Sequence, residues 1–159
     1  IFWNTSWFKM RPPHTTGSYI ANEHPLFRLF PTDNWSNLNW WELLNKAQVM
    51  NLSEFPKSYQ SPIQTIDTWH ISRKIGMLVE ANVGKGKLLM TTMDISRNLD
   101  KRPVARQMRK AILEYMNGSD FNPQLSIDSQ LITNLFEKEA PKVDMFTKDS
   151  PDELKPKIK

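Results

Sequence analysis

The sequence predicts a mixed α/β fold, and its two strongest elements are a β-hairpin and a packed helix. Two runs of β-favouring residues lie in 74–95, "KIGMLVEANVGKGKLLMTTMDI", and flank a turn-forming "NVGKGK". A helix is expected from Pro103 to Asn117, since proline suits the first helical position and Gly118 follows the last. The chain has 159 residues, 39% of them hydrophobic and 24% charged, which suits about one domain with a buried core.

The turn of the hairpin is expected at Gly84 and Gly86, because glycine adopts positive φ without steric cost. These glycines and the neighbouring lysines also suggest a phosphate-binding loop. That motif requires G-x-x-x-x-G-K-[ST] ahead of a helix, whereas Gly86 and Lys87 are followed by the strand-like "LLMTT". We therefore expect a hairpin and no phosphate site.

The helix at 103–117 is amphipathic. Its apolar face comprises Val104, Met108, Ala111, Ile112, Tyr115 and Met116. Its other positions carry charges of both signs, including Arg106, Arg109, Lys110 and Glu114. A helix lying on a membrane surface is the alternative, but the mixed charges favour docking on a sheet.

Shorter elements are expected around these two. A helical turn or two is predicted at 24–31, a helix at 39–47 with Asn39 as a possible cap, and a short strand in "QVMNL". A further short helix is predicted within 126–140, where Ile127, Leu131 and Leu135 are spaced by four. Residues 1–22 are expected to be irregular, because Pro12, Pro13 and Gly17 interrupt them.

These signals divide the chain into a main unit at 1–118, a helical extension at 119–140 and a tail at 141–159. The tail is rich in lysine, aspartate, glutamate and proline and cannot bury enough surface to offset chain entropy. We predict that 148–159 have no independent fold and that 143–147 are ordered only if they dock.

Composition excludes several classes of function. The absence of cysteine removes disulfides, thiolate metal sites and cysteine nucleophiles. The net charge of +4 comes from scattered basic residues, whereas nucleic-acid binding usually requires a denser basic surface. No run approaches the ~18 apolar residues of a membrane span. The chain begins "IFWNTSWF", without an initiator methionine or a signal-peptide pattern, so we expect a piece of a longer polypeptide.

The histidines do not form a recognisable metal or catalytic motif. His14, His24 and His70 each stand alone, without H-E-x-x-H or similar spacing, and a structural role is favoured for each. No G-x-S-x-G elbow is present either. We expect no metal and no cofactor.

Three aspartates are the acids weighed for catalysis: Asp33, Asp67 and Asp94. A glycosidase needs two carboxylates that flank one bond, and the sequence does not pair these three. Asp94 follows a predicted strand, where it could act as a functional acid or equally cap the turn. No residue is assigned to catalysis.

All six tryptophans lie within the first 69 residues: Trp3, Trp7, Trp35, Trp40, Trp41 and Trp69. Exposed aromatic faces could hold sugar rings, with the nearby asparagines binding the hydroxyls. Adjacent Trp40 and Trp41 must point in different directions, and Trp40 shares a helical face with Leu43 and Leu44. Packing is favoured for the cluster, and Trp35 and Trp41 are the candidate carbohydrate-binding residues.

The order of several segments resembles a known family. "FWNTSWFKMRPPHTTGSYIANEHPLFRLFPTDNWSNLNWWELL", "IQTIDTW", "KIGMLVEANVGKGKLLMTTMDI" and "RPVARQMRKAILEYMNGSDFNP" follow one another. Together they resemble a C-terminal region of large bacterial glycoside hydrolase family 2 proteins, which are β-galactosidase- and β-glucuronidase-like. The resemblance covers about residues 1–136.

The resemblance implies that the sugar-cleaving site lies upstream, on a (β/α)₈ barrel with two glutamates. Neither the barrel nor its motifs occur here, so no catalytic residue is carried over. It also implies that residues 1–118 are the later part of a flavodoxin-like, class I glutamine-amidotransferase-like domain. Working amidotransferases of that type use a Cys-His-Glu triad, which a chain without cysteine lacks.

Three functions remain open. The first is a non-catalytic accessory domain of a family 2 glycoside hydrolase, with upstream domains of the same polypeptide as partners and a periplasmic or secreted location. The second is an autonomous carbohydrate-binding module that uses exposed tryptophans. The third is a small-molecule enzyme with a pocket that gathers His14, His70 and Asp94.

Overall fold

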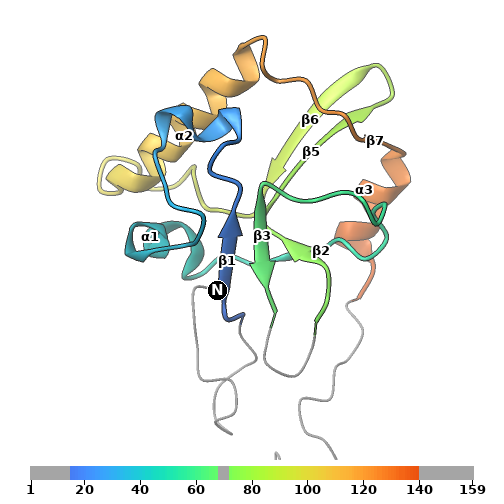
Figure 1. The fold of residues 1–159 in the computed structure, drawn as a ribbon, viewed down its shortest axis with the longest axis horizontal. Helices are drawn as coiled ribbons and strands as arrows, with labels where there is room; N and C mark the ends of the chain where they lie inside the picture. Colours follow the sequence, from blue (N-terminus) through green and yellow to red (C-terminus); the bar gives the residue numbers. More distant parts are fainter. Residues whose placement is uncertain (1–14, 68–71, 140–159) are drawn as a thin grey trace, which may run out of the picture.

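The computed structural model describes residues 15–67 and 72–139 of the chain. These residues form a mixed α/β structure with two β-sheets, which confirms the predicted class at this level. In the view of Figure 1, helices α1 and α2 lie on the left and α3 lies on the right. The predictions for the tail at 141–159 lie outside the described residues.

The first sheet has four strands in the order β1-β3-β4-β2, and all of its pairs are antiparallel. Its strands are β1 (Gly17–Ile20), β2 (Met50–Asn51), β3 (Ile63–Ile66) and β4 (Ile75–Gly76). Burial alternates along β1 and β3, with Ser18, Ile20, Ile63 and Thr65 buried. The prediction that residues 1–22 are irregular is wrong at 17–20, which form strand β1. These four residues become a strand because they pair with β3, which lies far away in the sequence.

The second sheet contains the predicted hairpin. Strands β5 (Leu78–Val83) and β6 (Gly86–Thr91) pair antiparallel, and β7 (Ser126–Ile127) pairs with β5 in parallel. The turn needs one positive φ, which Gly84 provides at 57°. Gly86 instead pairs with Val83 inside the ladder, so the positive φ predicted for Gly86 is wrong.

Helix α2 (Pro103–Asn117) has the predicted bounds. Its buried residues are Ala105, Met108, Ala111, Ile112 and Tyr115. Val104 is partly buried and Met116 is 38% exposed, so the buried stripe is narrower than the predicted apolar face. The helix is docked on the core, as its mixed charges indicated.

The short helical segments are confirmed with different limits. The turn predicted at 24–31 is the 3₁₀ helix η1 (Pro25–Leu29), and the helix predicted at 39–47 comprises the 3₁₀ turn η2 (Leu38–Trp40) and α1 (Trp41–Leu44). The cap is Asn37 and not Asn39, because the Oδ1 of Asn37 accepts a hydrogen bond from the Asn39 backbone N–H at 3.0 Å.

Helix α3 (Ser129–Glu137) is the helix predicted within 126–140. It begins after Asp128, whose Oδ1 accepts a hydrogen bond from the Gln130 backbone N–H at 2.7 Å. Ile127 therefore belongs to β7 and not to the apolar face of the helix. This strand joins the helical extension to β5 by backbone pairing.

The described core has two clusters. The larger cluster packs Trp40 and the α1 residues Leu43 and Leu44 with the buried face of α2. The smaller cluster comprises Met50, Leu52, Phe55 and Val79, against which the partly buried Leu131 and Leu135 of α3 pack. In the described ranges, no helix is long and apolar enough to cross a membrane.

Candidate functional site

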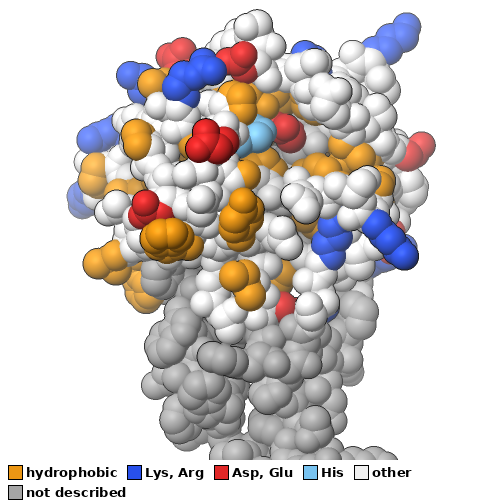
Figure 2. Space-filling view, in the orientation of Figure 1, with side chains coloured by type: hydrophobic (Ala, Val, Ile, Leu, Met, Phe, Trp, Pro, Cys, Tyr) orange, Lys and Arg blue, Asp and Glu red, His pale blue; other side chains and the backbone are white. Residues whose placement is uncertain are grey.

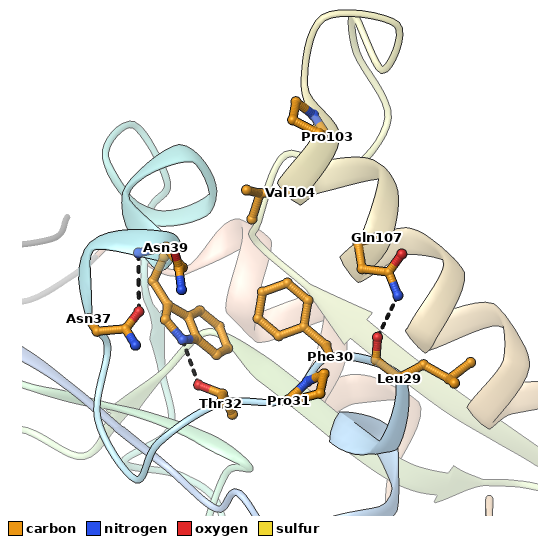
Figure 3. Close-up of a pocket in the computed structure, with 10 residues that line it drawn as sticks. Leu29, Phe30, Pro31, Thr32, Asn37, Asn39, Pro103, Val104 and Gln107 are labelled. Carbon is orange, nitrogen blue, oxygen red and sulfur yellow. Dashed lines mark hydrogen bonds between the residues drawn. The ribbon is translucent and has the colours of Figure 1, made fainter.

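A cleft of about 450 Å³ lies between the segment 29–40 and the start of α2 (Figure 3). One wall comes from the end of η1 and the chain after it, and the other comes from the first turns of α2. The apolar lining residues are Leu29, Phe30, Pro31, Trp40, Pro103 and Val104. The polar ones are Thr32, Asn37, Asn39 and Gln107, and none of the ten is charged.

Hydrogen bonds fix several of these polar groups. The indole N–H of Trp40 donates to the Thr32 hydroxyl at 2.9 Å, and the Gln107 amide donates to the Leu29 carbonyl at 2.5 Å. Within the described residues, the Asn39 side-chain amide and the Gln107 Oε1 have no hydrogen-bond partner. The cleft thus offers carboxamide groups, which both donate and accept, to a molecule placed in it.

The tryptophans within 35–41 diverge, as predicted for Trp40 and Trp41. Trp40 is 0% exposed and makes edge-to-face contacts with Phe27 and Phe30, at centroid distances of 6.0 and 5.3 Å. Trp41 is 47% exposed and Trp35 is 61% exposed. Packing is therefore the role of Trp40, whereas the two candidate carbohydrate-binding residues reach the surface.

Trp35 also lies opposite Tyr19 in an isolated antiparallel bridge. Directly opposed residues place their side chains on the same face, and Tyr19 is 48% exposed. Ile66 of the neighbouring β3 is 54% exposed. Figure 2 shows hydrophobic side chains on the face of the molecule that carries β1 and β3.

Asp94 holds a turn and is not free for acid–base work. Its carboxylate accepts backbone hydrogen bonds from Ser96 and Arg97, and pairs with the side chains of Arg97 at 2.9 Å and Arg102 at 3.1 Å. Burial raises the pKa of Asp94, but these hydrogen bonds and the Arg102 charge outweigh it and lower the pKa to about 2. At neutral pH the Asp94 carboxylate is therefore ionised, and it stabilises the turn and pairs with the two arginines.

Arg102 connects this turn to α1 and α2. Its guanidinium donates to the backbone carbonyls of Asp94 at 2.7 Å and Glu42 at 3.2 Å. The Glu42 carboxylate in turn accepts the Ala105 backbone N–H at 2.9 Å, which satisfies a free donor at the start of α2. Sequence reasoning missed this long-range cap, because Glu42 lies 63 positions before Ala105.

The other two aspartates have separate structural partners. Asp67 is buried and forms a two-point ion pair with Arg73, with nitrogen–oxygen distances of 2.7 and 2.9 Å. Asp33 accepts a hydrogen bond from the Asn37 amide at 3.1 Å. Each of the three aspartates is thus engaged by a different set of neighbouring residues.

His24 has the structural role that was favoured for it. Its Nδ1 accepts the Leu26 backbone N–H and caps η1, while its Nε2 lies 3.2 Å from Glu80 Oε1. The hydroxyl of Tyr115 donates to Glu80 Oε2 at 2.7 Å. Burial raises the pKa of Glu80, but the hydrogen bonds from His24 and Tyr115 outweigh it and hold the pKa below its ordinary value.

The pocket considered around His14, His70 and Asp94 is not described, because His14 and His70 lie outside the described residues. Within 15–67 and 72–139, there is no group of three or more histidine, aspartate or glutamate side chains that could hold a metal ion. Two candidate sites stand out in the described residues: the uncharged cleft and the exposed face with Tyr19 and Trp35.

Comparison with known sequences places the chain in one family. No curated protein matches the chain. Residues 1–137 match a family described as a domain of unknown function, DUF8487. Since the match covers most of the 159 residues, the chain belongs to the DUF8487 family.

Proposed function

We propose that the chain is a non-catalytic accessory domain of a larger family 2 glycoside hydrolase. The observation that carries the proposal is the structural use of three acids, Asp67, Glu80 and Asp94, and of His24. Asp94, Asp67 and Glu80 are each engaged by arginine, histidine or tyrosine side chains within the fold. The ordered resemblance of its segments to the C-terminal region of such enzymes supports the same role.

In this role, the upstream domains of the same polypeptide are the partners. Sugar cleavage would take place on an upstream barrel with two glutamates, and the present domain would support the assembly of the enzyme. A periplasmic or secreted location is what the family resemblance implies. No cofactor and no nucleic acid enter the proposal.

The test compares this chain with the longer polypeptide that contains it. The coding sequence immediately upstream should contain a barrel with paired glutamates. The longer protein should hydrolyse aryl β-galactosides or β-glucuronides, whereas the 159-residue chain should give only background hydrolysis. An upstream sequence without such a barrel, or turnover by the isolated chain comparable to that of an intact glycosidase, would overturn the proposal.

We further propose that the domain belongs to the flavodoxin-like, glutamine-amidotransferase-like class. The parallel pairing of β5 with β7 is compatible with such a sheet, although the other described strand pairs are antiparallel. The class therefore requires additional parallel strands from upstream. A structure of the longer polypeptide should show them beside an edge strand of the sheet, β6 or β7, and a sheet without further parallel strands would contradict the assignment.

A second candidate function is an autonomous carbohydrate-binding module. The exposure of Trp35 and Trp41 favours it, because a sugar ring needs an accessible aromatic face. Soluble glycans should then change the tryptophan fluorescence, and Trp35→Ala or Trp41→Ala should abolish the change. A spectrum that stays unchanged across a broad glycan panel would eliminate this function.

A further inference from the structure

The cleft between 29–40 and α2 is unlike the ion-paired regions of the molecule, since all ten lining residues are uncharged. A ligand with a carboxylate, sulfate or phosphate would find no cationic side chain in the lining to pair with. A cationic ligand would equally lack a carboxylate. The lining therefore selects for an uncharged molecule.

The polar groups of the cleft narrow the choice further. The Asn39 amide and the Gln107 Oε1 belong to exposed side chains and have no hydrogen-bond partner among the described residues, while Thr32 and Asn37 are held in place by hydrogen bonds. Carboxamides suit hydroxyl groups, because each hydroxyl both donates and accepts a hydrogen bond. The cleft also has an apolar wall, which comprises Leu29, Pro31, Pro103 and Val104.

We propose that this cleft binds a neutral sugar ring. The apolar C–H surface of the ring would rest on the aliphatic wall, and its hydroxyls would bond to Asn39 and Gln107. The site does not include Trp35 or Trp41, because neither tryptophan lines the cleft. The proposal goes beyond the accessory function and does not depend on attachment to a glycosidase.

The cleft is also preformed. Trp40 and Phe30 at its base are 0% and 7% exposed and contact each other edge to face. The hydrogen bond from the Trp40 indole to Thr32 ties this base to the rim. A volume of about 450 Å³ lies within the usual range for small-molecule sites, so binding would require little ordering of the protein.

The main competing occupant is an apolar side chain of another protein segment. Such a side chain would fill the aliphatic part of the cleft, but it would cover the Asn39 amide and the Gln107 oxygen without replacing their hydrogen bonds to water. Asn39 and Gln107 are exposed in the free protein, and burying their polar atoms without hydrogen-bond partners is unfavourable. A hydroxyl-bearing ring avoids this cost.

The test is a titration of the ¹⁵N-labelled 159-residue chain followed by two-dimensional NMR. The probes are methyl β-glucopyranoside, methyl β-galactopyranoside and xylose, with methyl β-glucuronide as the charged comparison and N-acetyl-leucinamide as a mimic of a docking side chain. The Asn39 and Gln107 side-chain signals and the Trp40 indole signal should shift saturably with a neutral sugar, with Kd below about 10 mM. The glucuronide should bind more weakly than its neutral counterpart.

Two variants and one control complete the test. Asn39→Ala should weaken binding about fivefold, since it removes one hydrogen-bonding group that has no role in the fold. Val104→Trp should fill the cleft and abolish binding, while Asn45→Ala, which changes an exposed amide outside the lining, should leave the affinity unchanged. If Val104→Trp fails to fold, Asn39→Ala decides the question.

Four results would overturn the proposal. They are the absence of saturable shifts with every neutral sugar, equal affinity in Asn39→Ala, saturation by N-acetyl-leucinamide alone, and shifts confined to the indoles of Trp35 and Trp41. The third result would identify a protein-docking groove, and the fourth would place sugar binding at Trp35 or Trp41 instead of the cleft. Hydrolysis by the longer polypeptide is a separate measurement, so the accessory function and the sugar site can fail independently.

Discussion

Helices α2 and α3 are held on the same molecule in different ways. α2 buries five residues in the larger core cluster, whereas no described residue of α3 is buried. α2 has no side-chain cap from its own N-cap residue and receives one from Glu42, while α3 is capped by its own Asp128. α2 therefore depends on deep burial and on a cap from a distant part of the chain, whereas α3 has a local cap and only partly buried contacts with the smaller cluster.

The ion pairs beside the two helices also differ in burial. Ion pairs at the start of α2 involve the half-buried Arg102, Glu42 and Asp94. The end of α3 is joined to Glu54, the residue before Phe55 of the smaller cluster, by an ion pair with Lys138 in which both side chains are exposed. An exposed pair contributes little to stability, so α3 should open before α2 does.

The largest destabilisation of the core around α2 is expected when the Trp40 side chain is removed from the larger cluster. Trp40→Ala should lower the free energy of unfolding by about 3–5 kcal/mol, because it deletes a fully buried aromatic side chain and leaves a cavity. Urea denaturation measures the change. Trp40→Phe retains part of the ring contact with Phe30 and should cost less. Equal stability of Trp40→Ala and the parent chain would contradict the role of Trp40 in packing.

The long-range cap can be removed without opening a cavity. Glu42→Ala should lower the free energy of unfolding by about 1–2 kcal/mol, because the Ala105 N–H and Arg102 both lose a partner. Amide hydrogen exchange should increase in the first turn of α2 and remain unchanged in α3. Glu23→Ala is the control, since Glu23 is exposed. An equal loss in the control would show that general charge, and not the cap, sets the effect.

A smaller effect is expected when α3 is loosened. Leu131→Ala removes part of its contact with the smaller cluster and should cost about 1 kcal/mol, since Leu131 is only partly buried. Hydrogen exchange should speed up in α3 and not in α2. Phe136→Ala, at a position that is 75% exposed, is the matched control and should leave exchange unchanged. Faster exchange in both helices would mean that they unfold together.

The sequence predicted the elements whose signals are local. Pro103 and Gly118 marked the limits of α2, and the two β-favouring runs around Gly84 predicted the hairpin. The neighbouring positions of Trp40 and Trp41 were enough to show that the two side chains would point in different directions. In each case the determining residues lie within a few positions of one another, so a single chain segment contains the information.

The features that sequence reasoning missed depend on distant pairing. Strand β1 is defined by its partner β3, and Ile127 enters a strand because β5 is available beside it. The polar lining of the cleft joins residues 29–40 to Gln107, which are brought together only by the docking of α2 on η1 and α1. The cap at Asn37 is a local exception: the sequence offers asparagine at both 37 and 39, and the signal does not distinguish between them.

The smallest predicted effect concerns acid stability at the start of α2. The pKa of Asp94 is lowered from 3.8 to about 2 in the folded chain. A lowered carboxyl pKa stabilises the fold above the unfolded value, and this contribution is lost as the pH falls from about 4 toward 2. The effect is modest because the Asp94 side chain is 30% exposed and its pairing with Arg97 is screened by water.

Asp94→Asn tests this contribution, because it removes the titrating charge and keeps a similar shape. The melting temperature of the variant should be slightly lower than that of the parent chain at pH 7, and the difference should shrink as the pH approaches 2. Some acid sensitivity should remain in the variant, since the pKa of Glu80 is also lowered, by its hydrogen bonds to His24 and Tyr115 against the effect of burial. If the difference in melting temperature stays constant from pH 7 to pH 2, Asp94 stabilises the start of α2 through geometry alone and its charge has no part in it.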